Sequence, residues 1–144
     1  MAQGHVNLVK LCVGAESVED LLDWQADPRA KGPDGRVRHV TRMWPRRESE
    51  LLAGGSLYWV IKGVILARQR ILRLDEVIGG DGTLRCGIVL EGAVARTRPV
   101  PRKPFQGWRY LAPEDAPGDV PAGREAEPHL PPKLQAALSE LGVL

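Results

Sequence analysis

The sequence predicts an α+β fold, a small and mostly antiparallel β-barrel with two or three short helices and a C-terminal tail helix. Two observations lead to this prediction. About six strand-like runs of alternating or β-branched residues stand against only two or three helical segments. The runs between residues 56 and 100 also follow one another after short turns, without the crossover helices that parallel strands require.

The first strand and the first helix are expected near the N-terminus. Residues 5–13 are β-branched and partly alternating, which is typical of a strand. Ser17 followed by Asp20 forms a capping box, in which a side chain satisfies a free backbone N–H at the start of a helix. The apolar stripe that follows predicts a helix over about residues 17–27.

A second strand and a short helix are expected around the middle of the chain. Residues 37–43 alternate and predict a strand. Pro45 suits the first turn of a short helix over residues 45–53, and the glycine pair 54–55 ends it.

The remaining strands are expected over residues 56–63, 64–77, 83–91 and 93–100. Gly63 indicates a tight turn or a bulge, and Gly79–Gly82 predicts a hairpin turn. Residues 102–111 are expected to form a loop that ends in an aromatic run.

Three parts of the chain are distinguished by composition. Residues 1–111 are expected to form a single domain, and residues 112–132 a proline-rich, acidic linker. Residues 133–144 predict a C-terminal helix with one leucine-rich face. The acidic linker is expected to lie over the basic face of the domain.

The sequence favours a cytoplasmic protein without cofactor or metal. No apolar run approaches the roughly 18 residues of a membrane span, and the start lacks the pattern of a secretory signal. Cys12 and Cys86 show no paired spacing, so we expect buried, reduced thiols. The three histidines, His5, His39 and His129, are too scattered to predict a zinc site.

Charge is distributed unevenly along the chain. Residues 36–111 hold 15 Lys and Arg against 6 Asp and Glu, a net charge of +9, and both flanking segments are acidic. A basic segment of this density is typical of a partner such as RNA or a nucleotide-like polyanion. The alternative is that the arginines only solvate strand faces.

Six of the seven aromatic residues lie in this basic segment. Because side chains alternate along a strand, Trp59 is expected in the core and Tyr58 in a cleft. Trp44 lies at a strand-to-helix corner, where a ring can plug the barrel or stack on a base. Trp108 is expected in a loop, a better position for ligand contact than a strand.

The cations next to these rings predict an anion site. Arg42, Arg46 and Arg47 surround the expected start of the short helix, where free N–H groups favour anions. The alternative is that Arg46 and Arg47 pair with Glu48 and Glu50 on a solvated face. Three further cations on the neighbouring strands are expected to line the same groove, namely Lys62, Arg68 and Arg70.

Two resemblances add to this interpretation. The stretches VKLCVGAESVEDLLDWQ, HVTRMWPRR, GGSLYWVIKGVI and PFQGWRYL resemble an uncharacterised bacterial family of unknown function. More distantly, a strand ending in Thr-Arg, a short helix and a Gly-x-x-Leu-Tyr-Trp strand are similar to the pseudobarrel superfamily of PUA, ASCH and EVE domains. That resemblance implies binding of RNA or modified bases. Gly35 and Arg42 match the ASCH pattern Gly-x-Lys-x-x-x-x-Arg, but Val37 stands at the lysine position.

The resulting hypothesis is a module that binds RNA or a modified nucleotide in one basic, aromatic cleft. The predicted ligand-binding residues are Arg42, Trp44, Arg46, Arg47, Tyr58, Lys62, Arg68, Arg70, Trp108 and Arg109. One alternative is an amidohydrolase of modified nucleosides, with Lys62, Thr41 and Glu48 or Glu50 in its active site. The other is a protein-interaction domain that binds no nucleic acid.

Overall fold

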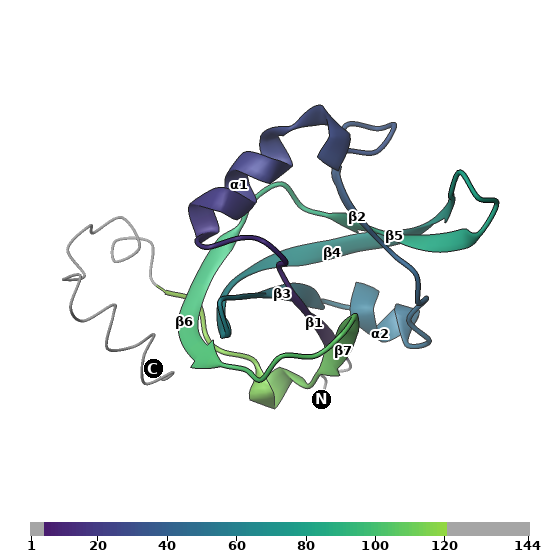
Figure 1. The fold of residues 1–144 in the computed structure, drawn as a ribbon. Helices are drawn as coiled ribbons and strands as arrows, with labels where there is room; N and C mark the ends of the chain where they lie inside the picture. The colour runs from purple at the N-terminus through teal and green to yellow at the C-terminus, as the bar shows by residue number, and fades with distance from the viewer. Residues whose placement is uncertain (1–4, 121–144) are drawn as a thin grey trace.

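The computed structural model describes residues 5–120, which form an α+β fold on a seven-stranded sheet (Figure 1). The strands are β1 (Asn7–Leu11), β2 (Val37–Thr41), β3 (Ser56–Ile61), β4 (Val64–Ile78), β5 (Leu84–Leu90), β6 (Ala95–Pro101) and β7 (Trp108–Leu111). The α-helices are α1 (Val18–Ala26) and α2 (Glu48–Leu52), and single 3-10 turns cover Pro28–Ala30 and Pro113–Asp115.

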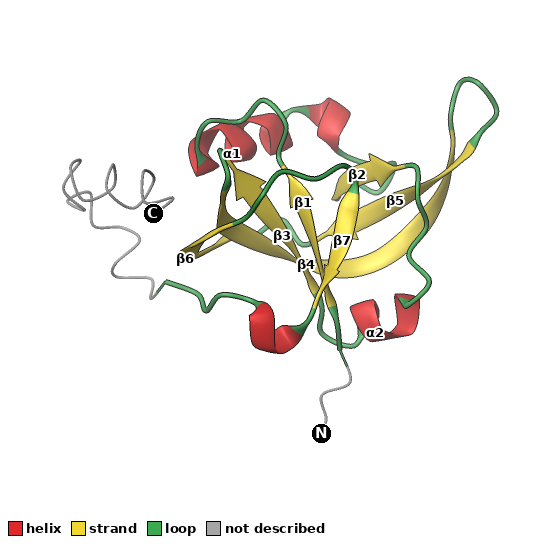
Figure 2. Ribbon diagram, turned by 60° about the horizontal axis from the view of Figure 1, so that its bottom comes forward, coloured by secondary structure: helices red, strands yellow, loops and turns green. Residues whose placement is uncertain are grey.

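The sheet is open and strongly bent (Figure 2). Its strand order is β2-β5-β4-β3-β1-β7, and β6 pairs with β4 outside this path. All pairs are antiparallel except β1 with β3. The mostly antiparallel α+β class is thereby confirmed. Within residues 5–120, β2 and β7 remain as separate edges, so the closure into a barrel that we predicted is not shown.

The bend of the sheet arises in β4, whose two halves serve different partners. Its first half lies between β3 and β6, and its second half pairs with β5. The register shifts between Trp59 and Val60, between Ile65 and Ala67, and between Ile71 and Arg73. Such irregularities add twist and bend a strand, which lets one long strand curve around the core.

At Gly63, where the sequence indicates a tight turn or a bulge, the structure has a tight turn, and the predicted hairpin turn at Gly79–Gly82 is confirmed. Lys62 and Gly63 form a two-residue turn between β3 and β4 with φ of 52° and 82°, as a type I′ hairpin requires. The Gly79 N–H donates to the Thr83 carbonyl at 2.9 Å and closes the turn between β4 and β5. Residues 56–98 therefore form at least three antiparallel strands, with no helix across 64–75.

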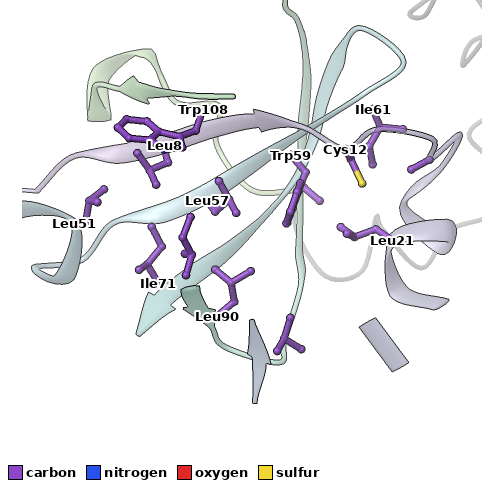
Figure 3. Close-up of a cluster of buried hydrophobic side chains, with 14 of the residues drawn as sticks. Leu8, Cys12, Leu21, Leu51, Leu57, Trp59, Ile61, Ile71, Leu90 and Trp108 are labelled. Atoms are coloured by element: carbon purple, nitrogen blue, oxygen red, sulfur yellow. The ribbon is translucent and has the colours of Figure 1, made fainter. Parts of the chain in front are cut away.

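Two apolar clusters cover the two faces of the sheet. The larger one holds Leu8, Leu57, Trp59 and Ile71, together with residues of both α-helices (Figure 3). The smaller one is built around Val9, Tyr58, Val60, Ile65 and Leu111. Neighbouring residues of one strand enter different clusters because side chains alternate between the faces.

Helix α1 begins as the sequence predicts and covers the larger cluster. The Ser17 hydroxyl accepts from the Asp20 N–H at 3.2 Å, and the Asp20 carboxylate accepts from the Glu16 N–H at 2.9 Å. Val18 and Leu21 are the buried residues of the helix. They fix the helix over the sheet, where it forms one wall of the candidate site described below.

Two local predictions are wrong. Helix α2 starts at Glu48 rather than at Pro45, so the Arg46–Arg47 pair precedes the helix. Residues 108–111 form strand β7 rather than a loop, because they pair with β1 in an antiparallel register.

The first part of the predicted linker packs on the sheet. The N–H groups of Arg98 and Val120 donate to the carbonyls of Gly118 and Arg96, both at 2.9 Å, so residues 118–120 run along β6. The Asp119 carboxylate binds the Arg68 guanidinium at 2.7 Å. The rest of the predicted linker and the C-terminal helix over 133–144 lie outside the described residues. Among residues 5–120, no helix is both long and apolar enough to cross a membrane.

Candidate ligand-binding site

The anion site that we predicted at the start of α2 is not available. The N–H groups of Arg46 and Arg47 both donate to the Tyr110 hydroxyl, at 2.8 and 3.2 Å. An aromatic hydroxyl therefore occupies the position that a ligand anion was expected to take. The helix is also only five residues long, too short for a substantial dipole.

The arginines of this region face solvent. Arg47 forms a two-pronged ion pair with Glu50 at 2.8 Å and lies 5.2 Å from the centre of the Tyr110 ring. For Arg47, the structure therefore shows the alternative, a solvent-exposed ion pair with Glu50. Arg42 and Arg46 are exposed, and within residues 5–120 their side chains form no ion pair.

The two tryptophans that we expected to contact a ligand here belong to the core. Trp108 is buried on β7, and its indole N–H donates to the Met43 carbonyl at 3.0 Å. Trp44 is half-buried and packs against the larger cluster. Because the Trp108 N–H has a protein partner, the ring is fixed as a wall rather than presented to solvent.

A second group of predicted residues lies on the face of the smaller cluster. Tyr58 is buried there, and burial raises its pKa. Arg68 pairs with Asp119, and Arg70 lies two residues further on β4, exposed. Arg109 is exposed and stacks 5.3 Å from the centre of the Phe105 ring. The expectation that Tyr58 would face a cleft is therefore wrong, because both faces of β3 are covered.

Lys62 lies at a third place, in the turn after β3, about 20 Å along the chain direction of that strand from its start near α2. The ten predicted residues therefore do not converge on one cleft. Of the residues proposed for hydrolysis, Lys62 lies apart, whereas Thr41 pairs with Cys86 on β5. Burial and, after it, the charge of Glu48 raise the pKa of that thiol. Glu50 is bound to Arg47.

A different pocket brings polar and aromatic side chains together under α1. It encloses about 290 Å³ between that helix, β1 and β2, and we call it the His39 pocket. It is lined by Lys10, Leu11, Cys12, Val13, Leu21, Trp24, Gln25, Ala30, Val37, Arg38, His39 and Trp59. Two of these residues are cationic and none is acidic, so the pocket favours an anionic or electron-rich ligand.

His39 lines this pocket with a ring that carries one unpartnered nitrogen. Its Nε2 is buried and has no hydrogen-bond partner among the described residues. Its ring meets Trp59 edge-on, with 5.3 Å between the ring centres. Burial, helped by the charge of Lys10, lowers the pKa of His39 from 6.5 to about 4. The imidazole is thus neutral near pH 7, and its buried Nε2 lacks the hydrogen-bond partner that buried polar atoms usually have.

Lys10 places an ammonium group in an otherwise apolar wall. It pairs in register with Trp59 on one side and Trp108 on the other, and burial lowers its pKa. Cys12 lies two residues further, directly after the end of β1, and is buried in the larger cluster. Burial raises the pKa of its thiol to about 11, so the thiol is protonated and not a nucleophile.

The back wall of the pocket is held by a buried glutamine. Gln69 is 1% exposed, and its amide exchanges two hydrogen bonds with Gln25, at 2.7 and 2.8 Å. The same amide accepts from the Trp59 indole at 2.9 Å and donates to the Glu91 carbonyl at 2.9 Å. All four hydrogen-bonding positions of the Gln69 amide are used, which fixes the Trp59 wall. At the rim, Trp24 keeps 45% of its surface exposed.

The sequence contains a signal for this pocket in the pattern of its strands. Lys10 and His39 stand at inward-facing positions of their strands, next to Leu8 and Val37 on the same faces. A titratable side chain on the apolar face of a strand breaks the local pattern, and such breaks are typical of functional sites.

We expect His39 to reduce stability at acid pH. Its folded-state pKa of about 4 lies below the ordinary 6.5, so the unfolded chain takes up a proton first. Stability is then complete above about pH 6.5 and falls as the pH drops towards 4, by at most about 3 kcal/mol. Urea unfolding at pH 7 and pH 4.5 would measure this change.

The comparison requires a variant without the imidazole. His39→Gln should lose less stability between these two pH values than the parent protein. His5→Gln removes an imidazole outside the pocket and serves as the control. Equal losses in the parent and in His39→Gln would contradict the assignment.

The fold and the pocket define a small α+β protein with a cationic, tryptophan-walled pocket on a bent sheet. The sequence matches the family described as "Protein of unknown function (DUF1489)" over residues 8–144, and the chain belongs to that family. The resemblance to an uncharacterised family is thereby confirmed. No curated protein and no solved structure matches the sequence.

Proposed function

We propose that the protein binds a nucleotide or an unstacked base of single-stranded RNA, and that the base enters the His39 pocket. The observation that carries this proposal is the unpartnered Nε2 of His39 beside the Lys10 ammonium. A base edge offers donors and acceptors to the imidazole, a phosphate pairs with the ammonium, and indole rings pack on the base face.

Two further features support this proposal. The volume of about 290 Å³ is at the low end for ligand pockets, which suits one base rather than several. Exposed arginines elsewhere on the domain, among them Arg42, Arg46 and Arg70, can contact a longer backbone. The bent sheet with a helix over one face also agrees with a divergent relative of the PUA-like pseudobarrels. We place such a nucleotide-binding role in the cytoplasm, where the thiols of Cys12 and Cys86 stay reduced.

The test is a binding titration, measured by calorimetry, with the four nucleoside monophosphates and with a short single-stranded RNA. Lys10→Met keeps the length of the side chain but removes its charge, and we expect it to weaken binding about tenfold. Lys103→Met removes the same charge from an exposed residue outside the pocket and should change the affinity little.

Two results would overturn the proposal. One is the absence of binding to every monophosphate and to the RNA at millimolar concentration. The other is equal affinity in Lys10→Met and Lys103→Met. If the RNA binds more tightly than the mononucleotides and its affinity falls steeply with salt, the exposed arginines contribute phosphate contacts.

A further inference from the structure

A second hollow lies at the C-terminal end of β1, next to the His39 pocket, with which it shares Leu11, Cys12 and Val13. It encloses about 320 Å³ and has an apolar floor that includes Leu11, Ala15 and Val60. Lys62 and Arg102 stand at its rim, and no acidic residue lines it. We call it the Lys62 pocket.

The two cations at this rim are held together by the backbone. The Arg102 N–H donates to the Gly63 carbonyl at 2.8 Å, which ties the start of the 102–107 segment to the turn that carries Lys62. The Arg102 guanidinium lies 5.9 Å from the centre of the Phe105 ring. Within residues 5–120, neither cation forms an ion pair with a carboxylate, so both charges are available to a ligand.

The conformation of Lys62 indicates that this lysine has a role beyond forming the turn. Its φ is 52°, and it is the one non-glycine residue with positive φ among residues 5–120. A type I′ turn favours Asn or Gly at this position, because other side chains are strained there. Strained backbone positions of this kind occur preferentially at functional sites.

We infer that the Lys62 pocket binds a small amphipathic anion, a carboxylate on an apolar chain or ring. The carboxylate pairs with Lys62 and Arg102 at the rim, and the apolar part lies on Leu11 and Val60. This combination of a charged rim and an apolar floor matches a ligand with one charged end. The site differs from the His39 pocket in having no tryptophan and no histidine among its lining residues.

The test uses sodium octanoate as the probe, with binding followed by calorimetry and by NMR chemical shifts. We expect octanoate to bind at least tenfold more tightly than octanol, which lacks the charge, and than acetate, which lacks the chain. Lys62→Asn removes the charge and places a favoured residue in the turn. It should weaken octanoate binding at least fivefold while leaving the melting temperature equal or higher.

Two more variants complete the design. Arg102→Gln should weaken octanoate binding to a similar extent. Lys103→Asn makes the same substitution as Lys62→Asn next to Arg102 but outside the pocket, and it should bind as the parent does. The inference is overturned if Lys62→Asn binds octanoate as tightly as the parent, or if octanol binds as well as octanoate. It is equally overturned if octanoate does not bind at millimolar concentration.

Discussion

Gly55→Ala is expected to destabilise the protein by about 3 kcal/mol or more, a large share of the stability of a domain of this size. A methyl group at Gly55 would meet the Val6 carbonyl oxygen and, at 2.7 Å, the Leu51 carbonyl oxygen. Both neighbours are backbone atoms, so no side chain can turn away to make room. Overpacking against backbone forces the chain itself to move, which costs more than a rotamer change.

The position of Gly55 explains why a displacement of its backbone would affect neighbouring elements. Its N–H donates to the Leu51 carbonyl at 2.8 Å, and its carbonyl accepts from the Ile71 N–H at 3.0 Å. It therefore joins the end of α2 to the middle of β4, while Val6 enters β1 on the other side. A displaced backbone at this point disturbs three elements at once.

Thermal unfolding followed by circular dichroism would measure the effect of Gly55→Ala, with an expected fall of about 10 °C in the melting temperature. Gly80→Ala is the matched control, because a methyl group there meets nothing within 4 Å. We expect that control to change the melting temperature by no more than about 2 °C. Similar melting temperatures for the two variants would show that the backbone near Gly55 can yield.

The parts of the fold that the sequence predicts correctly are those that depend on near neighbours. Ser17 caps α1 through a residue three positions away, and the turn at Gly79–Gly82 closes within five residues. Strands β3 to β5 follow from alternation and from these turns. In each case the physical cause lies within a few residues along the chain.

The errors occur where the decisive partner is remote. Strand β7 is only four residues long and becomes a strand because it pairs with β1, about 100 residues away in the sequence. The N–H groups of Arg46 and Arg47 bind the Tyr110 hydroxyl, 64 and 63 residues away. Propensity and spacing contain no information about such partners, so they predict a loop at Trp108 and an anion site at the helix start.

The candidate site shows the same difference between local and remote causes. The sequence predicts that rings and cations act together, and the His39 pocket does combine Trp24 and Trp59 with Lys10. It does not predict which rings and cations meet, because the pocket assembles from β1, α1, β2 and β3. Only the bend of the sheet brings His39 and Lys10 to one cavity.

Gln69→Met is expected to cost about 2–5 kcal/mol of stability, because it breaks the buried network behind this cavity. Methionine fills a similar volume, so the loss reflects hydrogen bonds rather than packing. The Trp59 indole N–H and the Glu91 carbonyl would each lose a partner. Gln25 is half-buried and can turn towards water, so the loss of its two hydrogen bonds to Gln69 should contribute less.

Urea unfolding of Gln69→Met, with the exposed Gln106→Met as its control, would measure this cost. A double-mutant cycle with Trp59→Phe isolates the hydrogen bond of the Trp59 indole N–H, since phenylalanine has no N–H that could be left without a partner. In the Gln69→Met background, Trp59→Phe should cost at least about 1 kcal/mol less than in the parent, because a buried donor without a partner is then removed. The network would not hold the Trp59 wall if the two substitutions proved additive, or if Gln69→Met cost no more than Gln106→Met.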